Sequence, residues 1–180
     1  MMHVRAIEKY CPQHGIDTSI ELVSFLSQVL HETGGFKWLR EIWTPTKQQL
    51  RYERDFSEPW PEKIKGKRNY LATMLGNSEK GDGKLFMGRG DIQTTGRANY
   101  MRMSKEMFGD DRLLKNPELL TAPEYAMQSA CIYWKWRKLD LVDDDYKIEQ
   151  ETKAVNGGFN GLDDRQKYFD RGCKVFNLKN

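Results

Sequence analysis

The chain of 180 residues has little cysteine, and its three cysteines are far apart. An odd and widely spaced set, Cys11, Cys131 and Cys173, matches neither a disulfide framework nor paired metal ligands. We therefore expect free thiols. Cys131 and Cys173 lie in apolar helical patterns, which favours a role as small core residues.

Histidine and long apolar segments are also scarce. The three histidines, His3, His14 and His31, lie near the N-terminus without the spacing of metal ligands, which argues against a zinc-dependent enzyme such as an amidase. No run approaches the ~18 apolar residues of a membrane span, and no basic stretch followed by an apolar run opens the chain. We expect no metal, no organic cofactor, no signal peptide and no stable membrane insertion.

An excess of charge of one sign is absent as well. The chain has 29 basic and 26 acidic residues, and its formal net charge is +3. This balance is typical of a solvated surface of mixed charge and is too small to indicate nucleic acid as a partner. A modest preference for anionic polymers such as cell walls stays open.

Helical periodicity is the main pattern that the sequence does contain. Thr18-Ser19-Ile20-Glu21 matches a capping box and precedes apolar residues at helical spacing, which predicts a buried helix over 19–33. A second capping box, Thr121-Ala122-Pro123-Glu124, predicts an apolar helix through Trp134. The remaining expectations are helices at about 62–75, 146–155 and 163–176, a loop-rich wall at 44–61, and a loop with at most a short hairpin at 76–90. Without a repeat or linker, the pattern predicts one mainly α domain.

Two carboxylates stand out. Glu32 ends the apolar helix within His31-Glu32-Thr33-Gly34-Gly35-Phe36, and Glu41 follows nine residues later. On a continuous helix these side chains would point to roughly opposite faces, but the two glycines break the helix. Apolar neighbours would partly remove Glu32 from water, which favours the protonated form that a general acid needs. Two carboxylates across a cleft are what glycosidic bond hydrolysis requires. The alternatives are an exposed glutamate at a helix end and a surface ion pair of Glu41 with Arg40.

A second dense stretch runs from Gly88 to Tyr100. Its glycines allow close approach to a ligand, and Gln93, Thr95 and Asn99 offer amides and a hydroxyl suited to sugars. The spacing matches neither of the glycine-rich phosphate loops. Two more candidates come later in the chain. Asn156 precedes Gly157-Gly158 at a helix end, where it can also serve as an ordinary stop, and Arg165 lies in the first turn of the last helix, where a plain ion pair is the alternative.

These motifs together resemble glycoside hydrolase family 19, the chitinase family, which includes many phage endolysins. The motifs are His31-Glu32-Thr33-Gly34-Gly35-Phe36, Gly88-Arg89-Gly90-x-Ile92-Gln93-x-Thr95-Gly96-Arg97-x-Asn99-Tyr100 and Asn156-Gly157-Gly158. The similarity covers about residues 15–177. It implies a single catalytic domain over 1–180, with a lysozyme-like, two-lobed helical fold, a substrate cleft and at most a small β-hairpin.

The resemblance also implies a role for each residue that matches a motif. Glu32 corresponds to the general acid, Glu41 to the general base, and Thr95 to the hydroxyl that holds the attacking water. The residues that correspond to the substrate-binding set are Gln93, Asn99, Asn156, Arg165 and His31, with the arginine supporting the carboxylates. Family members invert the anomeric centre, for which the carboxylates generally lie about 6.5–9.5 Å apart.

We therefore expect a monomeric phage-type endolysin that hydrolyses the β-1,4 bonds of peptidoglycan glycan strands. It would be made in the bacterial cytoplasm and would reach the wall through a holin. The alternatives are a bacterial chitinase that acts on chitin oligomers by the same mechanism and an inactive wall-binding module. Asp91 and Ala98 depart from the common family pattern, so the choice between chitin and peptidoglycan stays open.

Overall fold

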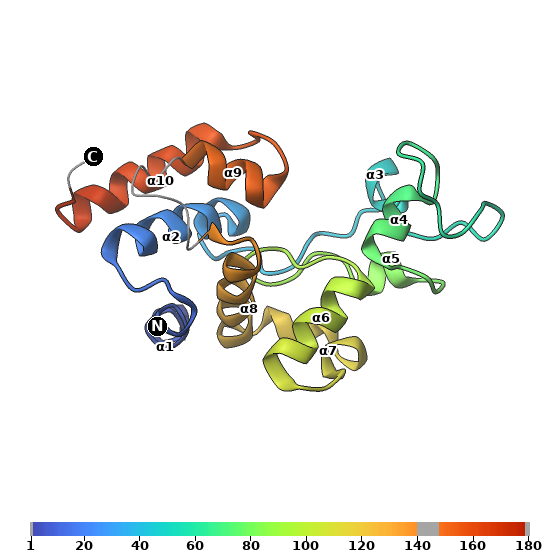
Figure 1. The fold of residues 1–180 in the computed structure, drawn as a ribbon, viewed down its shortest axis with the longest axis horizontal. Coiled ribbons are helices and arrows are strands. Elements are labelled where there is room, and N and C mark those ends of the chain that lie inside the picture. Colours follow the sequence, from blue (N-terminus) through green and yellow to red (C-terminus); the bar gives the residue numbers. More distant parts are fainter. Residues whose placement is uncertain (1, 140–147, 179–180) are drawn as a thin grey trace.

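Helix α2 (Ser19–Thr33) is the element that carries the first candidate residues. In the computed structural model, which describes residues 2–139 and 148–178, its capping box forms as predicted, with the Thr18 hydroxyl accepting from the Glu21 amide. Gly34 ends it in a left-handed conformation. The helix packs along α10 (Leu162–Val175), and α9 (Ile148–Asn156) lies against both (Figure 1).

A second group of helices forms the centre of the molecule. Helix α1 (Met2–Tyr10), which the sequence analysis did not predict, packs on α8 (Pro123–Trp136). Helix α6 (Arg97–Phe108) packs on α7 (Arg112–Lys115) and α8, next to a 3-10 turn, η2 (Pro117–Thr121). The short turn η1 (Pro12–His14) follows α1. Two main cores result, one between α1, α2 and α8 and one between α6, α7 and α8.

The other end of the molecule holds three short helices, α3 (Lys47–Leu50), α4 (Tyr70–Leu75) and α5 (Asp82–Leu85). Two extended segments connect this end to the helices around α2 (Figure 1). Arg40 of one segment forms an isolated bridge with Arg89 of the other, and a second isolated bridge joins Arg89 to Thr94 within the same segment. No strand occurs in the described residues. The mainly helical, two-lobed, lysozyme-like fold is confirmed.

Several local predictions were wrong. The helix expected over 62–75 begins only at Tyr70, because Gly66 adopts φ +93° and interrupts the chain before it. The second capping box does not form: Ala122 is the N-cap of α8, and the Thr121 hydroxyl bonds to Glu118 in η2. The end of the Gly88–Tyr100 stretch is the start of helix α6. The expected start of the helix at 146 lies outside the described residues.

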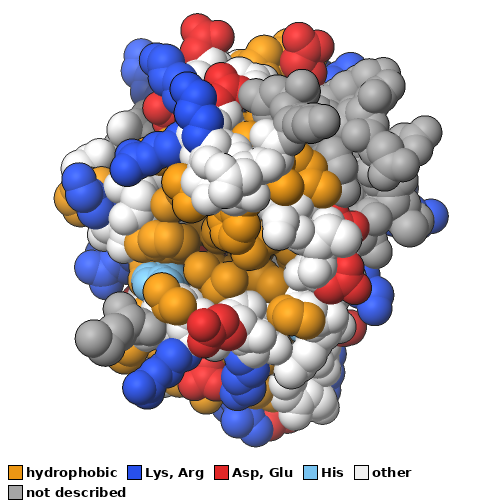
Figure 2. All heavy atoms as spheres, turned by 90° about the vertical axis from the view of Figure 1, so that its left-hand side faces the viewer, with side chains coloured by type: hydrophobic (Ala, Val, Ile, Leu, Met, Phe, Trp, Pro, Cys, Tyr) orange, Lys and Arg blue, Asp and Glu red, His pale blue; other side chains and the backbone are white. Residues whose placement is uncertain are grey.

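One face of the molecule carries an apolar hollow. On the face made by α1, the start of α2 and the end of α10, hydrophobic side chains gather in a hollow with charged side chains around it (Figure 2). None of the helices in the described ranges has the length and apolar character to cross a membrane. Cys11, Cys131 and Cys173 are buried free thiols, so the predicted core positions of the last two are confirmed.

Candidate active site

Glu32 lies on the last turn of α2 and is held by a residue from the opposite end of the chain. The guanidinium of Arg165, fully buried on α10, donates one hydrogen bond to Glu32 and a second, of 2.7 Å, to the Gln28 side chain. The Glu32 side chain keeps 20% of its surface exposed. The buried Arg165 thus fixes the direction of the Glu32 carboxylate, and part of the Glu32 side chain stays exposed to solvent.

A buried polar network continues behind this pair. Glu151 on α9 is fully buried and accepts a hydrogen bond from the Ser24 hydroxyl on α2. Burial raises the pKa of Glu151 to about 7, because the charged form loses its hydration. Sequence reasoning missed Glu151 and Gln28, and the only signal for them was that each polar residue occupies an apolar helix face.

His31 is placed differently from its predicted role in substrate binding. Its Nδ1 lies 2.8 Å from a carboxylate oxygen of Asp164, and its ring packs against Gly161, where a side chain would clash. Both partners belong to the start of α10. His31 therefore helps to dock α10 onto α2 and so to position Arg165, and a contact of His31 with substrate stays a prediction.

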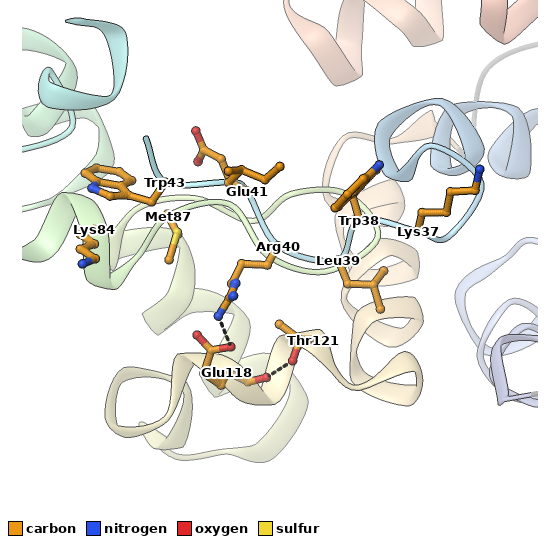
Figure 3. Close-up of a pocket in the computed structure, with 11 residues that line it drawn as sticks. Lys37, Trp38, Leu39, Arg40, Glu41, Trp43, Lys84, Met87, Glu118 and Thr121 are labelled. Atoms are coloured by element: carbon orange, nitrogen blue, oxygen red, sulfur yellow. Dashed lines mark hydrogen bonds and ion pairs between the residues drawn. The ribbon is translucent and has the colours of Figure 1, made fainter. Parts of the chain in front are cut away.

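Glu41 lies on the extended segment 39–43, which leads away from α2. Both its backbone and its side chain bond Gly88: the Glu41 amide donates to the Gly88 carbonyl at 2.8 Å, and the Gly88 amide donates to the Glu41 carboxylate at 3.1 Å. The Gln49 side chain donates to the other carboxylate oxygen at 2.9 Å. Figure 3 shows Glu41 and Arg40 pointing to opposite sides of the segment, with Arg40 directed toward Glu118. The alternative considered for Glu41, an ion pair with Arg40, is thus not formed, and Arg40 pairs with Glu118.

Gln93, Thr95 and Asn99 lie together, as the motif predicted. They line a cavity of about 400 Å³ whose other walls include Tyr133, Trp136 and Arg137. The Thr95 hydroxyl donates to the Gln93 carbonyl, and the Asn99 side chain donates to the Thr95 carbonyl, both at 2.8 Å. Part of the aromatic side of α8 therefore borders this cavity.

Gly88 connects the two parts of the site. A side chain at Gly88 would meet the Gln93 amide oxygen at 2.7 Å and the Thr95 hydroxyl at 3.3 Å. The same residue bonds Glu41 through its amide and carbonyl. Glycine is required here because the backbone passes between Glu41 on one side and Gln93 and Thr95 on the other.

The segment that contains Gly88 is fixed by a buried arginine. Arg89 donates to the carbonyls of Leu85 and Met87, to the Tyr100 hydroxyl at 3.1 Å, and to Glu118 at 2.7 Å. The motif residues Arg89 and Tyr100 therefore hold the loop in place. A pocket of about 610 Å³ lies beside this segment, and Glu41 lines it together with Lys37, Trp38, Arg40 and Lys84.

Asn156 is the last residue of α9 and is exposed. Val155, its neighbour, lines the cavity that contains Gln93, Thr95 and Asn99. A role of Asn156 in sugar binding and the separation of about 6.5–9.5 Å between the carboxylates of Glu32 and Glu41 stay predictions. Among the described side chains, no group of three or more histidines, cysteines or acids is arranged to hold a metal ion.

Comparison with known proteins points to one family. No protein-family model matches the chain. A glycosyl hydrolase family 19 domain-containing protein of Haemophilus influenzae is 29% identical over 177 residues, which cover 92% of this chain and 84% of that protein. The chain is therefore similar to a glycoside hydrolase family 19 protein over nearly its whole length. This similarity supports a glycoside hydrolase.

Other family 19 proteins are more distant. Chitinase 6 of Oryza sativa is 24% identical over 169 residues; the match covers 90% of this chain and about half, 54%, of the rice protein. The fold resembles chitinase C of Streptomyces griseus, with a TM-score of 0.62, 19% identity, and coverage of 89% of this chain and 74% of that one. A bacterial family 19 chitinase has a TM-score of 0.66 at 19% identity, and the match covers 99% of this chain and 86% of that one. A class IV chitinase of Zea mays has a TM-score of 0.60 at 20% identity, and the match covers 99% of this chain and 79% of that one.

Proposed function

We propose that this protein is a family 19 endolysin that cleaves the β-1,4 bonds of peptidoglycan glycan strands with inversion. The observation that carries the proposal is that two carboxylates are each held by side chains from other segments, Glu32 by Arg165 and Glu41 by Gln49. Surface glutamates do not need such support. Each of the two is fixed in direction, as acid–base catalysis demands.

The roles follow from the chemistry of each group. Glu32 protonates the oxygen of the leaving sugar, and Glu41 removes a proton from the water that attacks the anomeric carbon from the other face. The Thr95 hydroxyl donates its hydrogen bond to the Gln93 carbonyl, so the hydroxyl oxygen can accept a hydrogen bond from that water. Gln93, Asn99 and Asn156 bind hydroxyl and acetamido groups of the sugars.

Charge favours peptidoglycan over chitin. Lys37 and Lys84 are exposed cations in the pocket that Glu41 lines, and the whole chain carries a net charge of +3. Peptidoglycan bears carboxylates on its lactyl groups and peptide stems, whereas chitin is neutral. Cations beside the base therefore favour the anionic polymer. Chitin is the second candidate, because the solved structures that resemble this chain are chitinases.

The decisive experiment compares the two polymers. Purified peptidoglycan and a soluble chitin derivative are incubated with the protein, and new reducing ends are counted. Release from peptidoglycan alone supports the proposal, and release from chitin alone overturns the choice of substrate. Mass spectrometry of the fragments identifies the reducing-end sugar, and an anhydro product would show a lytic transglycosylase instead.

Catalysis must also be separated from mere wall binding. Glu32→Gln should abolish release of reducing ends while sedimentation with insoluble peptidoglycan is unchanged. Glu106→Gln, at an exposed position of α6, is the matched control and should behave as wild type. Binding without hydrolysis by the wild-type protein would support an inactive wall-binding module. We further propose that the enzyme is a monomer that is held in the bacterial cytoplasm until a holin releases it to the wall.

A further inference from the structure

Asp91 is a buried carboxyl that the proposed mechanism does not use. It lies at the tip of the loop between Arg89 and Thr94, two residues before Gln93, and its side chain has no exposed surface. Neither carboxylate oxygen has a hydrogen-bond partner. The next residue, Ile92, belongs to the core between α1, α2 and α8. An isolated carboxyl in such a place is costly, so its environment must hold a compensating group.

The compensating group comes from α1. The Nε2 atom of His3 lies 3.4 Å from the Asp91 carboxylate, and the His3 side chain is 18% exposed. The other titratable side chain facing Asp91 is the Cys131 thiol of α8, which contacts Cys11; this contact and burial raise the pKa of Cys131, so the thiol is uncharged in the neutral range. His3 is thus the one described side chain that can share a proton with Asp91.

His3 also reaches the turn that follows Glu32. Its ring packs on Phe36 with 4.3 Å between ring centres. Phe36 has φ +63°, directly after Gly34 and Gly35, which are also left-handed. One side chain of α1 therefore contacts both the turn after the general acid and the loop that presents Gln93.

The loop that Asp91 occupies is strained. Gln93 has φ +53°, an unfavourable value for a residue with a side chain, and it persists only where surrounding contacts enforce it. Within the loop, the Gln93 amide donates to the Gly90 carbonyl at 3.2 Å, and the Gln93 side chain donates to the same carbonyl at 3.0 Å. Asp91 and Ile92 are the residues enclosed by this turn, so an anchor at Asp91 fixes the direction of Gln93.

We propose that His3 and Asp91 form a proton-sharing pair through which α1 holds the Gly90–Thr95 loop in its binding conformation. Both are positioning residues for Gln93 and Thr95. The inference rests on the proposed function, since it assigns a role in the same site. The pair holds one proton between the carboxylate and the imidazole. The hydrogen bond between the two side chains is lost when a second proton is added or when that proton is removed.

The charge states agree with this arrangement. Burial raises the pKa of Asp91 to about 7 and lowers the pKa of His3. Above neutral pH the pair loses its proton and leaves a buried anion beside a neutral imidazole. The loop then loses its anchor, so sugar binding weakens on the alkaline side.

The test is a pH series of kcat and KM, on whichever polymer the wild type cleaves. His3→Ala should lower kcat/KM about tenfold, mainly through KM, because a displaced Gln93 no longer meets the sugar. Asp91→Asn keeps the shape of the side chain and cannot ionise. Its kcat/KM should stay within about twofold of the wild-type value near pH 7, and it should fall less than the wild-type value above pH 7. In the double variant, the effect of His3→Ala should shrink, because the partner carboxylate is gone.

A control separates positioning from stability. Leu113→Ala removes a fully buried side chain of α7 in the core between α6, α7 and α8, and it should lower the unfolding temperature without changing KM or the pH profile. If His3→Ala behaves like Leu113→Ala, or if Asp91→Asn has the alkaline decline of wild type, the inference is wrong. A wild-type protein that cleaves neither polymer would instead contradict the proposed function.

Discussion

The buried guanidinium of Arg165 bonds Glu32 and Gln28 at the same time, although 133 and 137 residues separate it from them in the chain. One nitrogen of the rigid guanidinium plane donates to the Glu32 carboxylate and the other to the Gln28 amide oxygen, so the direction of the carboxylate is fixed relative to Gln28. A lysine at this position has a single charged nitrogen and cannot reproduce both bonds. Arg165 is therefore the residue through which α10 controls the geometry of α2.

Replacement of this arginine is the first prediction. Arg165→Lys should lower kcat about 10²-fold because Glu32 loses its fixed direction. It should also lower the free energy of unfolding by roughly 2 kcal/mol, since a hydrogen bond to a charged group is lost in a buried site. Steady-state kinetics and urea unfolding measure the two effects. A wild-type kcat in a folded Arg165→Lys variant would show that Glu32 does not depend on this pair.

Loss of the acid itself is the second prediction. Glu32→Gln should reduce kcat by about 10²- to 10⁴-fold, because an amide cannot donate the proton that the leaving oxygen needs. The amide oxygen can still accept from Arg165, but the buried guanidinium loses its anionic partner, so the unfolding temperature should fall as well. Persistent hydrolysis by the folded variant would assign the acid to another residue.

The third prediction concerns the support of the base. Gln49→Leu removes the hydrogen bond to Glu41 while it preserves the volume of the side chain, and kcat should fall about tenfold as Glu41 gains freedom. Gln48→Leu, at the exposed neighbouring position, is the matched control and should leave kcat unchanged. Equal kinetics in both variants would mean that Gln49 does not orient the base.

A small steric change provides the fourth prediction. In Gly88→Ala the new methyl group would meet the Gln93 amide oxygen at 2.7 Å, so Gln93 must turn away. We expect KM to rise about tenfold with folding intact. The Gln93 amide binds the sugar only from its native position, and the new methyl group displaces it. Isothermal titration with a chito-oligosaccharide or a muropeptide checks binding directly. Unchanged affinity would exclude Gln93 from the binding site.

The fifth prediction is a pH dependence of stability. The pKa of Glu151 is about 7 in the folded protein and 4.5 for the ordinary side chain, so the folded state binds more protons between these values. The free energy of unfolding should therefore fall as pH rises from about 4.5 to 7, by on the order of 3 kcal/mol for this group. Glu151→Gln should flatten the curve measured by urea unfolding at pH 5 and pH 8. An equal slope in the variant would place the effect elsewhere.

Sequence reasoning succeeded where the determinants are local. The bounds of α2 follow from the Thr18 capping box and from Gly34, and both are adjacent to the residues they control. It failed at Tyr70 and Thr121. Gly66 interrupts the chain before Tyr70, and the Thr121 hydroxyl bonds the Glu118 carbonyl of η2 and does not cap α8. Helix α6 was missed because its first residues belong to a glycine-rich binding motif, which hides the helix start.

The candidate site shows the same division. Glu32, Glu41 and Gln93 lie in short motifs with a recognisable chemistry. Their supporting residues, Gln49 and Glu151, occupy other segments, and their neighbours in the sequence do not show which side chains they contact. Long-range pairing is set by how helices pack, which a single sequence does not display.

The hydrogen bonds between Glu41 and Gly88 have a mechanical consequence. The base is tied to the segment that also carries Gln93 and Thr95, so a displacement of Gly88 would shift all three groups together. Glu32 is held separately, by Arg165 of α10. The acid and the base therefore depend on different parts of the chain for their orientation.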